Sequence, residues 1–379
     1  MLRLSRLLRG ICFDGAEPSA KRSPPSAPVV IWNLTQRCNL HCRQCYAASA
    51  DRDYPGELTT AEALDLLDQL HGFGVRFLIL SGGEPLMHPD LFSIAAEAKR
   101  HGFHLSLSSN GTLMSEAMVA RIAAAGFDYV GVSLDGLSHE HDFIRGKEGA
   151  FAATMAGIRR CRAAGVDVGL RTTLTSVNAA LLPEMLGLCR KEGVRKFYLS
   201  HLNFAGRGKG NSTDAPSPRQ SAWAVDQLIE YAWAAVQDGT GVDIVTGNND
   251  SDAVRLLDWT GRVLPGRHDA MRRALLAWGG NSCGCGVANI DPRGNVHPDT
   301  MWGFASLGNV REHDFARIWT DGDNPLLARL RQHPRAVGGR CASCSHLAIC
   351  NGNSRVRAYR TDGDLWGEDP GCHMEQAFP

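Results

Sequence analysis

The fold is decided by the run Thr35-Gln36-Arg37-Cys38-Asn39-Leu40-His41-Cys42-Arg43-Gln44-Cys45-Tyr46, which follows the apolar stretch Val29-Val30-Ile31-Trp32. Its cysteines have the spacing C-x3-C-x2-C. A closed [4Fe–4S] cluster takes four cysteine thiolates. Because only three lie here, the run predicts a cluster in which one iron keeps an open coordination position for a substrate. A zinc site is the alternative, since a histidine lies inside the run, but zinc usually takes four ligands as two separate pairs.

Around this run, from residue 28 to about residue 204, apolar β-branched stretches alternate with helical ones. One helix opens at the capping box Thr59-Thr60-Ala61-Glu62 and stops at Gly72. Six β-α units in a row predict an α/β fold, a partial (β/α)6 barrel of parallel strands with helices outside. In such folds the chemistry lies at the C-terminal ends of the strands. The expected strands are residues 29–34, 76–80, 104–108, 129–134, 168–174 and 196–202.

The chain divides into four expected regions. Residues 1–27 form an N-terminal extension whose interleaved arginines and leucines predict a short amphipathic helix docked on the domain, not a signal peptide. The barrel spans residues 28–215. Residues 216–280 read as a helical linker region. Residues 281–379 are loop-rich, carry six cysteines and predict a small auxiliary domain.

Composition excludes several classes of partner. The 379 residues carry no formal net charge, so nothing in bulk charge favours nucleic acid or an acidic membrane. No segment approaches the roughly 18 apolar residues of a membrane span. A disulfide framework for the twelve cysteines suits small secreted chains, so we expect metal or cluster binding in a reducing cytoplasm.

Polar turns follow the expected strands. Ser81-Gly82-Gly83-Glu84-Pro85 offers bare amides and a carboxylate, which suit an α-amino group. Asn110 and Ser133 lie after the next two strands, where amide and hydroxyl groups suit a ribose, although ordinary turn chemistry also explains these residues. Arg145 and Arg171 suit a two-pronged contact with a carboxylate, or a purely structural role.

A second set of cysteines lies near the end of the chain, with the spacing C-x2-C-x5-C-x21-C. Four thiolates close a cluster completely and suit zinc equally well, so both interpretations stand. Cys283 and Cys285 fall outside this set and are expected to be buried thiols or a shared ligand. The four expected ligands are Cys341, Cys344, Cys350 and Cys372.

The first cysteine run, with Gly-Gly-Glu-Pro after the following strand, resembles the radical S-adenosylmethionine (SAM) superfamily. The resemblance implies that Cys38, Cys42 and Cys45 hold a [4Fe–4S] cluster at which SAM is split to a 5′-deoxyadenosyl radical. It implies SAM contacts from Gly82, Gly83, Glu84, Asn110, Ser133 and Arg145. One departure concerns Gln44, which stands where the family usually has an aromatic residue against adenine, so that contact is in doubt.

The C-terminal cysteines resemble the SPASM or twitch domain that carries auxiliary clusters in many radical SAM enzymes. The full pattern has seven cysteines, but Ser354 and Asp299 stand here where cysteines are often found. The resemblance therefore implies one auxiliary [4Fe–4S] cluster, and two clusters in all.

The last resemblance is carried by six stretches, at residues 31–35, 198–208, 245–250, 287–291, 297–300 and 338–341. Together they resemble the NirJ family, the radical SAM proteins of haem d1 biosynthesis, and the likeness spans about residues 28 to 372. The resemblance implies removal of two propionate side chains from 12,18-didecarboxysirohaem, an iron tetrapyrrole, with electrons from a small donor such as flavodoxin or ferredoxin. Arg171 and Arg207 are expected to meet substrate carboxylates, and His201 or His297 to ligate the tetrapyrrole iron, unless these histidines are structural.

Three other functions stay open. The nearest is removal of acetate side chains from the same substrate, in the alternative haem route. A second is a SPASM-type peptide-modifying enzyme, which would usually have a longer element before the barrel. The third, from a different class, is a non-catalytic iron–sulfur or zinc interaction protein.

Overall fold

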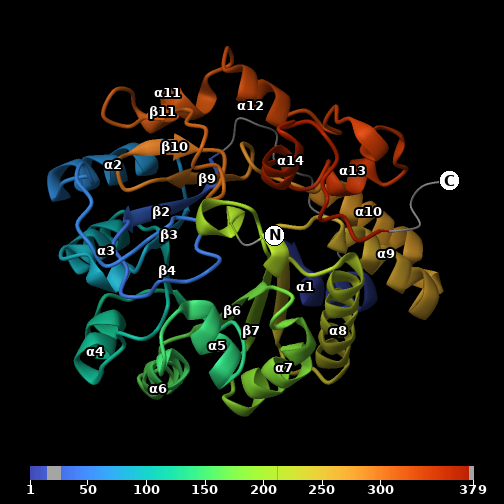
Figure 1. Ribbon diagram of the computed structural model, residues 1–379, viewed down its shortest axis with the longest axis horizontal. Helices are drawn as coiled ribbons and strands as arrows, with labels where there is room; N and C mark the ends of the chain where they lie inside the picture. The colour runs from blue at the N-terminus through green and yellow to red at the C-terminus, as the bar shows by residue number, and fades with distance from the viewer. Residues whose placement is uncertain (15–26, 211, 375–379) are drawn as a thin grey trace.

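The computed structural model describes residues 1–14, 27–210 and 212–374. Its centre is a curved sheet of parallel strands with helices outside it, so the predicted α/β fold is confirmed (Figure 1). All six strands expected from the sequence are present and neighbour one another in chain order. They are β2 (Val29–Thr35), β3 (Phe77–Gly82), β4 (His104–Ser109), β5 (Tyr129–Ser133), β6 (Val168–Leu174) and β7 (Lys196–His201).

The outer helices follow the pattern that the sequence predicts. In α2 (Thr60–Gly72) the Thr59 side chain accepts from the Glu62 amide, and Glu62 accepts from the Thr59 amide, which satisfies two free donors at the helix start. Leu66, Leu67 and Leu70 on its inner face are fully buried. The other helices around the barrel are α3 (Leu91–Arg100), α4 (Glu116–Ala124), α5 (Ser138–Arg145), α6 (Ala150–Ala163) and α7 (Leu182–Lys191).

The region expected to be a helical linker also contributes a strand. It contains α8 (Pro218–Gln237), α9 (Asp252–Val263) and α10 (His268–Trp278), but β8 (Asp243–Gly247) lies between the first two and pairs in parallel with β7. The helical expectation for residues 216–280 is therefore wrong at β8. Local periodicity cannot reveal a five-residue strand whose partners lie elsewhere in the chain.

The N-terminal extension extends the same edge of the sheet. β1 (Leu2–Arg3) pairs antiparallel with β8, and α1 (Leu4–Arg9) packs against α8 and β8. Leu4 and Leu8 are fully buried, which confirms the prediction of a short docked helix. The rest of the extension, residues 15–26, lies outside the described residues.

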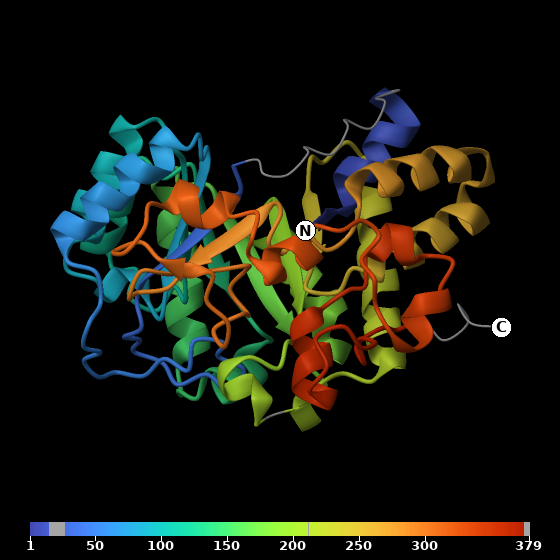
Figure 2. The same cartoon turned by 90° about the horizontal axis from the view of Figure 1, so that it is seen from above.

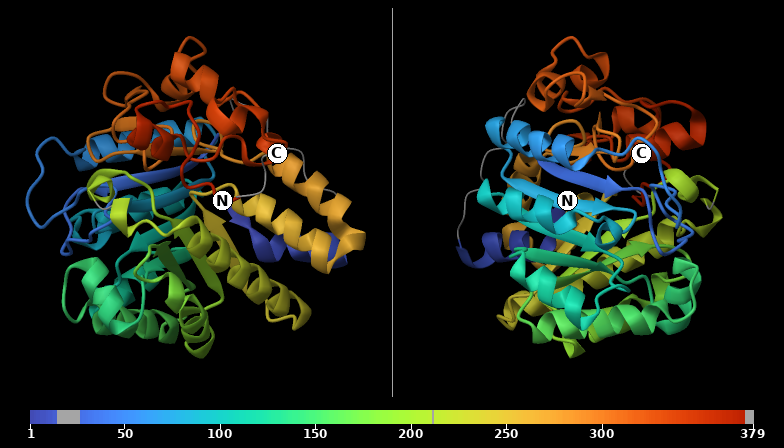
Figure 3. Two further views of the ribbon diagram at one scale, coloured as in Figure 1. Left: turned by 45° about the vertical axis from the view of Figure 1, so that its right-hand side comes forward. Right: turned by 90° about the vertical axis from the view of Figure 1, so that its left-hand side faces the viewer.

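The C-terminal region is built onto the opposite edge. β9 (Val287–Ile290) pairs in parallel with β2, and β10 (Asn295–His297) and β11 (Gly308–Asn309) follow, which leaves an open sheet of 11 strands. The rest of this region lies along one side of the barrel, against α9 and α10 as well (Figures 2 and 3). Its helices are α11 (Phe315–Thr320), α12 (Pro325–Leu330), α13 (Leu347–Cys350) and α14 (Arg355–Asp362).

Within the three described stretches, no helix has the length and apolar character needed to span a membrane.

Candidate functional site

The loop after β2 brings three thiols together. Cys38, Cys42 and Cys45 belong to one small buried cluster with Leu40 and Ala150, and all three are free. Burial raises the pKa of the Cys38 thiol to about 12. Each sulfur nevertheless has a nearby N–H donor: Asn110 Nδ2 at 3.9 Å from Cys38, Arg145 Nη1 at 3.7 Å from Cys42, and the Ser49 amide at 3.4 Å from Cys45.

These donors indicate what the loop is suited to hold. N–H donors stabilise sulfur that carries negative charge, as it does in a metal-bound thiolate. The three cysteines therefore fit a [4Fe–4S] cluster, with one iron free of protein thiolate. In the described part of the chain, no three His, Cys, Asp or Glu side chains have the geometry of a single-ion site.

Arg207 binds main-chain carbonyls of the cysteine loop. Its Nε donates to the Cys42 carbonyl at 2.7 Å, its Nη1 to the Ser49 carbonyl at 2.7 Å, and its amide to the Cys45 carbonyl at 2.9 Å. These bonds direct the Arg207 side chain to the cysteine loop, and its contact with a substrate carboxylate stays a prediction. Sequence cannot show this role, since the acceptors are main-chain atoms about 160 residues away.

The turn after β3 lies against the start of the cysteine loop. The amide of Gly83 donates to the Thr35 carbonyl at 2.7 Å. A Cβ at Gly82 would lie 2.4 Å from the Thr35 carbonyl oxygen, and one at Gly83 would lie 2.3 Å from that of Arg37. Glycine is thus required here for close approach to the protein's own backbone, in addition to any ligand.

Glu84 is fully buried and joins the ends of β3 and β4. Its carboxylate accepts from Ser109 Oγ at 2.8 Å and from the amides of Asn110 at 2.7 Å and Leu86 at 3.1 Å. Burial outweighs these donors and raises its pKa to about 7. The amide nitrogen of Asn110 reaches toward Cys38, so Glu84 positions a residue that contacts the cysteine loop.

A buried charge network joins the cysteine loop to β5 and α5. Arg145 Nη2 pairs with Asp135 Oδ2 at 2.6 Å, and Gln44 Nε2 donates to the same oxygen at 2.6 Å. Asp135 Oδ1 accepts from the Thr173 amide at 2.7 Å. Arg145 Nε and Gln44 Oε1 are buried without a partner among the described residues. Asp135 is not among the site residues expected from the sequence, and its contact with the cysteine loop is seen only in the structure.

Arg171 points into the barrel from β6. Its Nη1 donates to Ser108 Oγ at 2.8 Å, and its guanidinium lies 5.3 Å from the centre of the Tyr198 ring. Gly131 on β5 makes room for it, because a Cβ there would lie 2.7 Å from Arg171 Cδ. Ser133, at the end of β5, is the neighbour of Arg171 in strand register. The guanidinium of Arg171 therefore lies among side chains of β4 and β7.

The two candidate iron-binding histidines are engaged within the protein. His201 is buried, and its Nε2 lies 3.0 Å from Oδ2 of the fully buried Asp252. His297 Nδ1 lies 2.8 Å from the Ala305 carbonyl, and its Nε2 lies 3.5 Å from Asp291. Both histidines are therefore hydrogen-bonded within the protein, as in the structural role that the sequence left open, and iron ligation by either stays a prediction.

The four C-terminal cysteines also lie close to one another. Each is a free thiol, and the Cys344 amide donates to the Cys341 carbonyl at 3.2 Å. Burial, with smaller contributions from nearby negative charge that includes Cys372 and Cys341, raises the pKa of Cys350 to about 12. The same mutual effect links Cys372 to Cys341 and Cys344. Four thiols in one region suit a [4Fe–4S] cluster with no open position, whereas the described residues show no single-ion geometry of the kind zinc needs.

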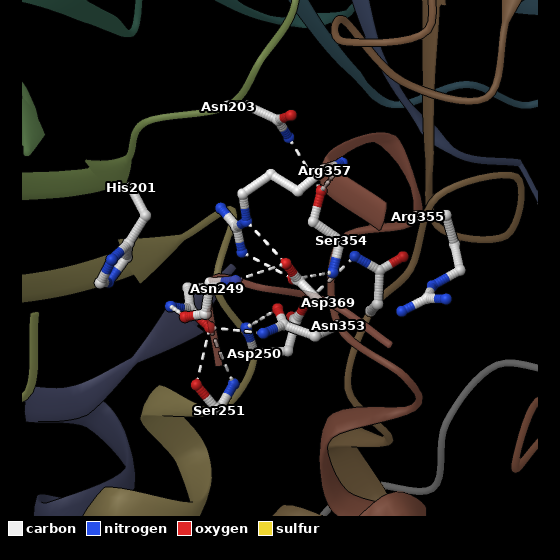
Figure 4. A network of polar contacts seen from close by, with 12 residues as sticks. His201, Asn203, Asn249, Asp250, Ser251, Asn353, Ser354, Arg355, Arg357 and Asp369 are labelled. Carbon is white, nitrogen blue, oxygen red and sulfur yellow. Dashed lines mark hydrogen bonds and ion pairs between the residues drawn. The ribbon is translucent and has the colours of Figure 1, made fainter. Parts of the chain in front are cut away.

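A polar network joins this region to the barrel (Figure 4). Arg357 pairs with Asp369 at 2.8 Å, with both side chains buried, and its Nη1 donates to the Leu202 carbonyl after β7. Asn203 Nδ2 donates to Ser354 Oγ at 3.0 Å. We call Asn203, Asn249, Asn353, Ser354, Arg357 and Asp369 the joint.

Ser354, which stands where the full SPASM pattern often has a cysteine, belongs to the joint. Ser354 is the N-cap of α14, where its hydroxyl accepts from the Arg357 amide, and its own amide donates to Asp369. Asp299 stands at the other position where a cysteine is often found. Its side chain accepts from the Met301 amide, and burial raises its pKa to about 6. Cys283 and Cys285 are buried thiols, as expected, and Arg335 donates to the Cys283 sulfur at 3.5 Å.

Comparison with known proteins agrees with this geometry. The model of the radical SAM superfamily matches residues 32–189. Pre-heme d1 synthase from Dinoroseobacter shibae is 48% identical over 379 residues, which covers 100% of this chain and 93% of that protein. Fe-coproporphyrin III synthase from Methanosarcina barkeri is 38% identical over 355 residues, 93% of this chain and 89% of that protein.

The fold has solved counterparts as well. The structure of native anSMEcpe with bound AdoMet has a TM-score of 0.69 at 16% identity, and the match covers 92% of this chain and 95% of that one. The chain therefore belongs to the radical SAM superfamily, whose members bind SAM and a [4Fe–4S] cluster, and within it to the family of pre-heme d1 synthase.

Proposed function

We propose that this chain is a radical SAM enzyme of haem d1 biosynthesis that removes two propionate side chains from 12,18-didecarboxysirohaem, on the way to the two ring oxo groups. The observation that carries the proposal is the 48% identity to pre-heme d1 synthase along the whole chain. The three gathered thiols of Cys38, Cys42 and Cys45 supply the chemistry that the function requires.

In this proposal the three cysteines hold the [4Fe–4S] cluster and leave one iron open. When bound at these cysteines, the cluster together with SAM would supply one-electron cleavage of the sulfonium and abstraction of a hydrogen atom from the substrate. The role of the protein is to hold the reactants and exclude water. The SAM site would be lined by residues gathered at the C-terminal ends of β3 to β5 and on α5: Gly82, Gly83, Glu84, Asn110, Ser133 and Arg145.

The auxiliary [4Fe–4S] cluster is assigned to Cys341, Cys344, Cys350 and Cys372. Four thiols leave no open iron, so this cluster would serve electron transfer or substrate placement, and not SAM binding. The electrons would come from a small carrier such as flavodoxin or ferredoxin.

Arg171 is the substrate contact that the geometry supports best. The substrate carries carboxylates, and a guanidinium can bind one by two parallel hydrogen bonds. Only one hydrogen bond from its side chain to the described residues is found, to Ser108, which leaves other N–H groups for a ligand. His201 and Arg207 are the weaker candidates for substrate contact, because His201 Nε2 lies beside Asp252 and Arg207 Nε donates to the Cys42 carbonyl.

The test is anaerobic incubation of the reconstituted protein with SAM, dithionite and 12,18-didecarboxysirohaem, followed by mass analysis. We expect release of 5′-deoxyadenosine and a product that has lost propionate. The similarity to Fe-coproporphyrin III synthase makes acetate removal the second candidate. A product that has lost acetate instead would favour the second candidate. If a protein with its full iron and sulfide content does not cleave SAM, the hypothesis that it is a radical SAM enzyme is refuted.

A further inference from the structure

Two of the donors to the cysteine sulfurs are side chains, and they differ in charge. Asn110 offers a neutral amide to Cys38, whereas Arg145 offers a cationic guanidinium to Cys42. Cys45 receives the backbone amide of Ser49. The surroundings of the three sulfurs are therefore asymmetric, with the positive charge on one side.

This asymmetry matters for electron transfer. Reduction adds negative charge to an iron–sulfur cluster, so hydrogen bonds and positive charges at its sulfurs raise the reduction potential. Hydrogen bonds from charged donors are roughly twice as strong as neutral ones. Arg145 has an 11% exposed side chain, so water screens its charge little.

Asp135 opposes this effect. The carboxylate is fully buried, lies 2.6 Å from Arg145 Nη2, and is held by Gln44 Nε2 and the Thr173 amide. It fixes the guanidinium toward Cys42 and also adds a negative charge near the cluster position. Because Gln44 comes from the cysteine loop itself, the loop and the ion pair hold each other in place.

We propose that Arg145 and Asp135 form a charge pair that sets the reduction potential of the SAM-binding cluster, with Arg145 raising it through Cys42 and Asp135 lowering it. The inference rests on the proposed function, because it needs a cluster at the three cysteines. It makes Arg145 and Asp135 positioning and tuning residues, whatever contact Arg145 also makes with SAM.

The test is a redox titration of the full, reconstituted chain, followed by electron paramagnetic resonance and carried out without SAM. Omitting SAM removes any contribution from lost SAM contacts. The signal of the SAM-binding cluster is identified in a parallel sample, because it is the signal that changes when SAM is added. Iron and sulfide counts on every sample establish that both clusters are present.

We expect shifts of opposite sign. Arg145→Met moves the midpoint potential to a more negative value, and Asp135→Asn moves it to a more positive one. Arg145→Lys keeps the charge but not the planar donor, so its midpoint falls between wild type and Arg145→Met. Arg159→Met is the matched control, because it removes an arginine that pairs with Glu192 on the surface, and its midpoint stays at the wild-type value.

The outcomes separate the two hypotheses. Wild type without a SAM-responsive cluster contradicts the proposed function. Wild type with that cluster, and Arg145 and Asp135 variants whose midpoints are unchanged or move in the same direction, overturns the charge-pair inference. Should Arg145→Met fail to load iron, Arg145→Lys and Asp135→Asn decide, since both retain a polar side chain at the site.

Discussion

The two cysteine-rich regions of the molecule are held in different ways. The loop of Cys38, Cys42 and Cys45 is held mainly through main-chain groups: Arg207 donates to the carbonyls of Cys42 and Ser49, and Gly83 donates to that of Thr35. The C-terminal region is held to the barrel by the pairing of β9 with β2 and by buried side chains, the Arg357–Asp369 pair and the amides of the joint. The contacts of Arg207 and Gly83 fix the main-chain path of the cysteine loop, whereas the buried side chains of the joint hold the C-terminal region against the barrel.

The largest effect should come from removing one thiol in each of the two cysteine-rich regions. Cys42→Ser should lose about four irons, the content of one [4Fe–4S] cluster, and reduce SAM cleavage to background. Cys350→Ser should also lose about four irons but retain measurable release of 5′-deoxyadenosine, because its cluster has no open position. Iron assay and chromatography of the reaction check both variants. Retained SAM cleavage in Cys42→Ser would contradict the distinction between the two regions.

The joint should be the most costly to break by a substitution that leaves the cysteines intact. Arg357→Met leaves Asp369 buried without its cation, and breaking a buried pair costs about 3–5 kcal/mol. Arg159→Met breaks a pair with an exposed arginine, where the cost is about 0–1 kcal/mol. Denaturant unfolding of both reconstituted variants measures the difference. Equal losses would mean that the joint does not stabilise the docking of the C-terminal region.

The pKa values of buried acids on the two sides are shifted in opposite directions. Burial raises the pKa of Glu84 to about 7, whereas that of Asp369 is lowered, because Arg357 and neighbouring donors outweigh the effect of burial. Glu84 is neutral in the folded protein below pH 7, so its contribution is fully present below about pH 4.5 and is lost as pH rises through 7. Asp369 contributes stability above its ordinary pKa, and that contribution is constant over this range.

This difference can be measured against Glu84→Gln, which cannot ionise. The unfolding free energy of wild type should fall relative to the variant by about 3 kcal/mol between pH 4.5 and 7, at 1.36 kcal/mol for each pKa unit. The slope is the readout, because the substitution has its own constant cost. Asp369→Asn should show no slope relative to wild type over the same interval. Parallel curves for wild type and Glu84→Gln would show that the three hydrogen bonds keep Glu84 ionised.

Much of this architecture follows from local sequence signals, and the rest does not. The strands from β2 to β7 and the capping box of α2 are visible because each depends on neighbours in the chain. The cysteine sets are visible for the same reason, since their spacing is local. The roles of Arg207, His201 and Asp135 are not visible, because their partners lie 165, 51 and 91 residues away. β8 is hidden as well, since its identity as a strand depends on pairing with β7 and β1.

The smallest effect concerns one methyl group behind the cysteine loop. Gly206 and Gly149 both have positive φ, at +54° and +76°, so alanine at either costs about 1–2 kcal/mol of backbone strain. A Cβ at Gly206 would also lie 2.2 Å from the Tyr46 carbonyl oxygen and 2.4 Å from that of Cys45, whereas nothing in the described chain lies within 4 Å at Gly149. Gly206→Ala should therefore cost about 1–3 kcal/mol more than Gly149→Ala.

The Gly206→Ala substitution should disturb the loop of Cys38, Cys42 and Cys45 and leave the C-terminal cysteines unaffected. The displaced carbonyls belong to the loop of the open cluster, so Gly206→Ala should load less iron there and cleave SAM more slowly. The C-terminal cluster should stay full, because the joint contacts the chain after β7 at Leu202 and Asn203, ahead of Gly206. Equal stability of the two alanine variants would show that the loop moves aside without cost. In that event the main-chain contacts of Arg207 would not be what holds the open iron in place.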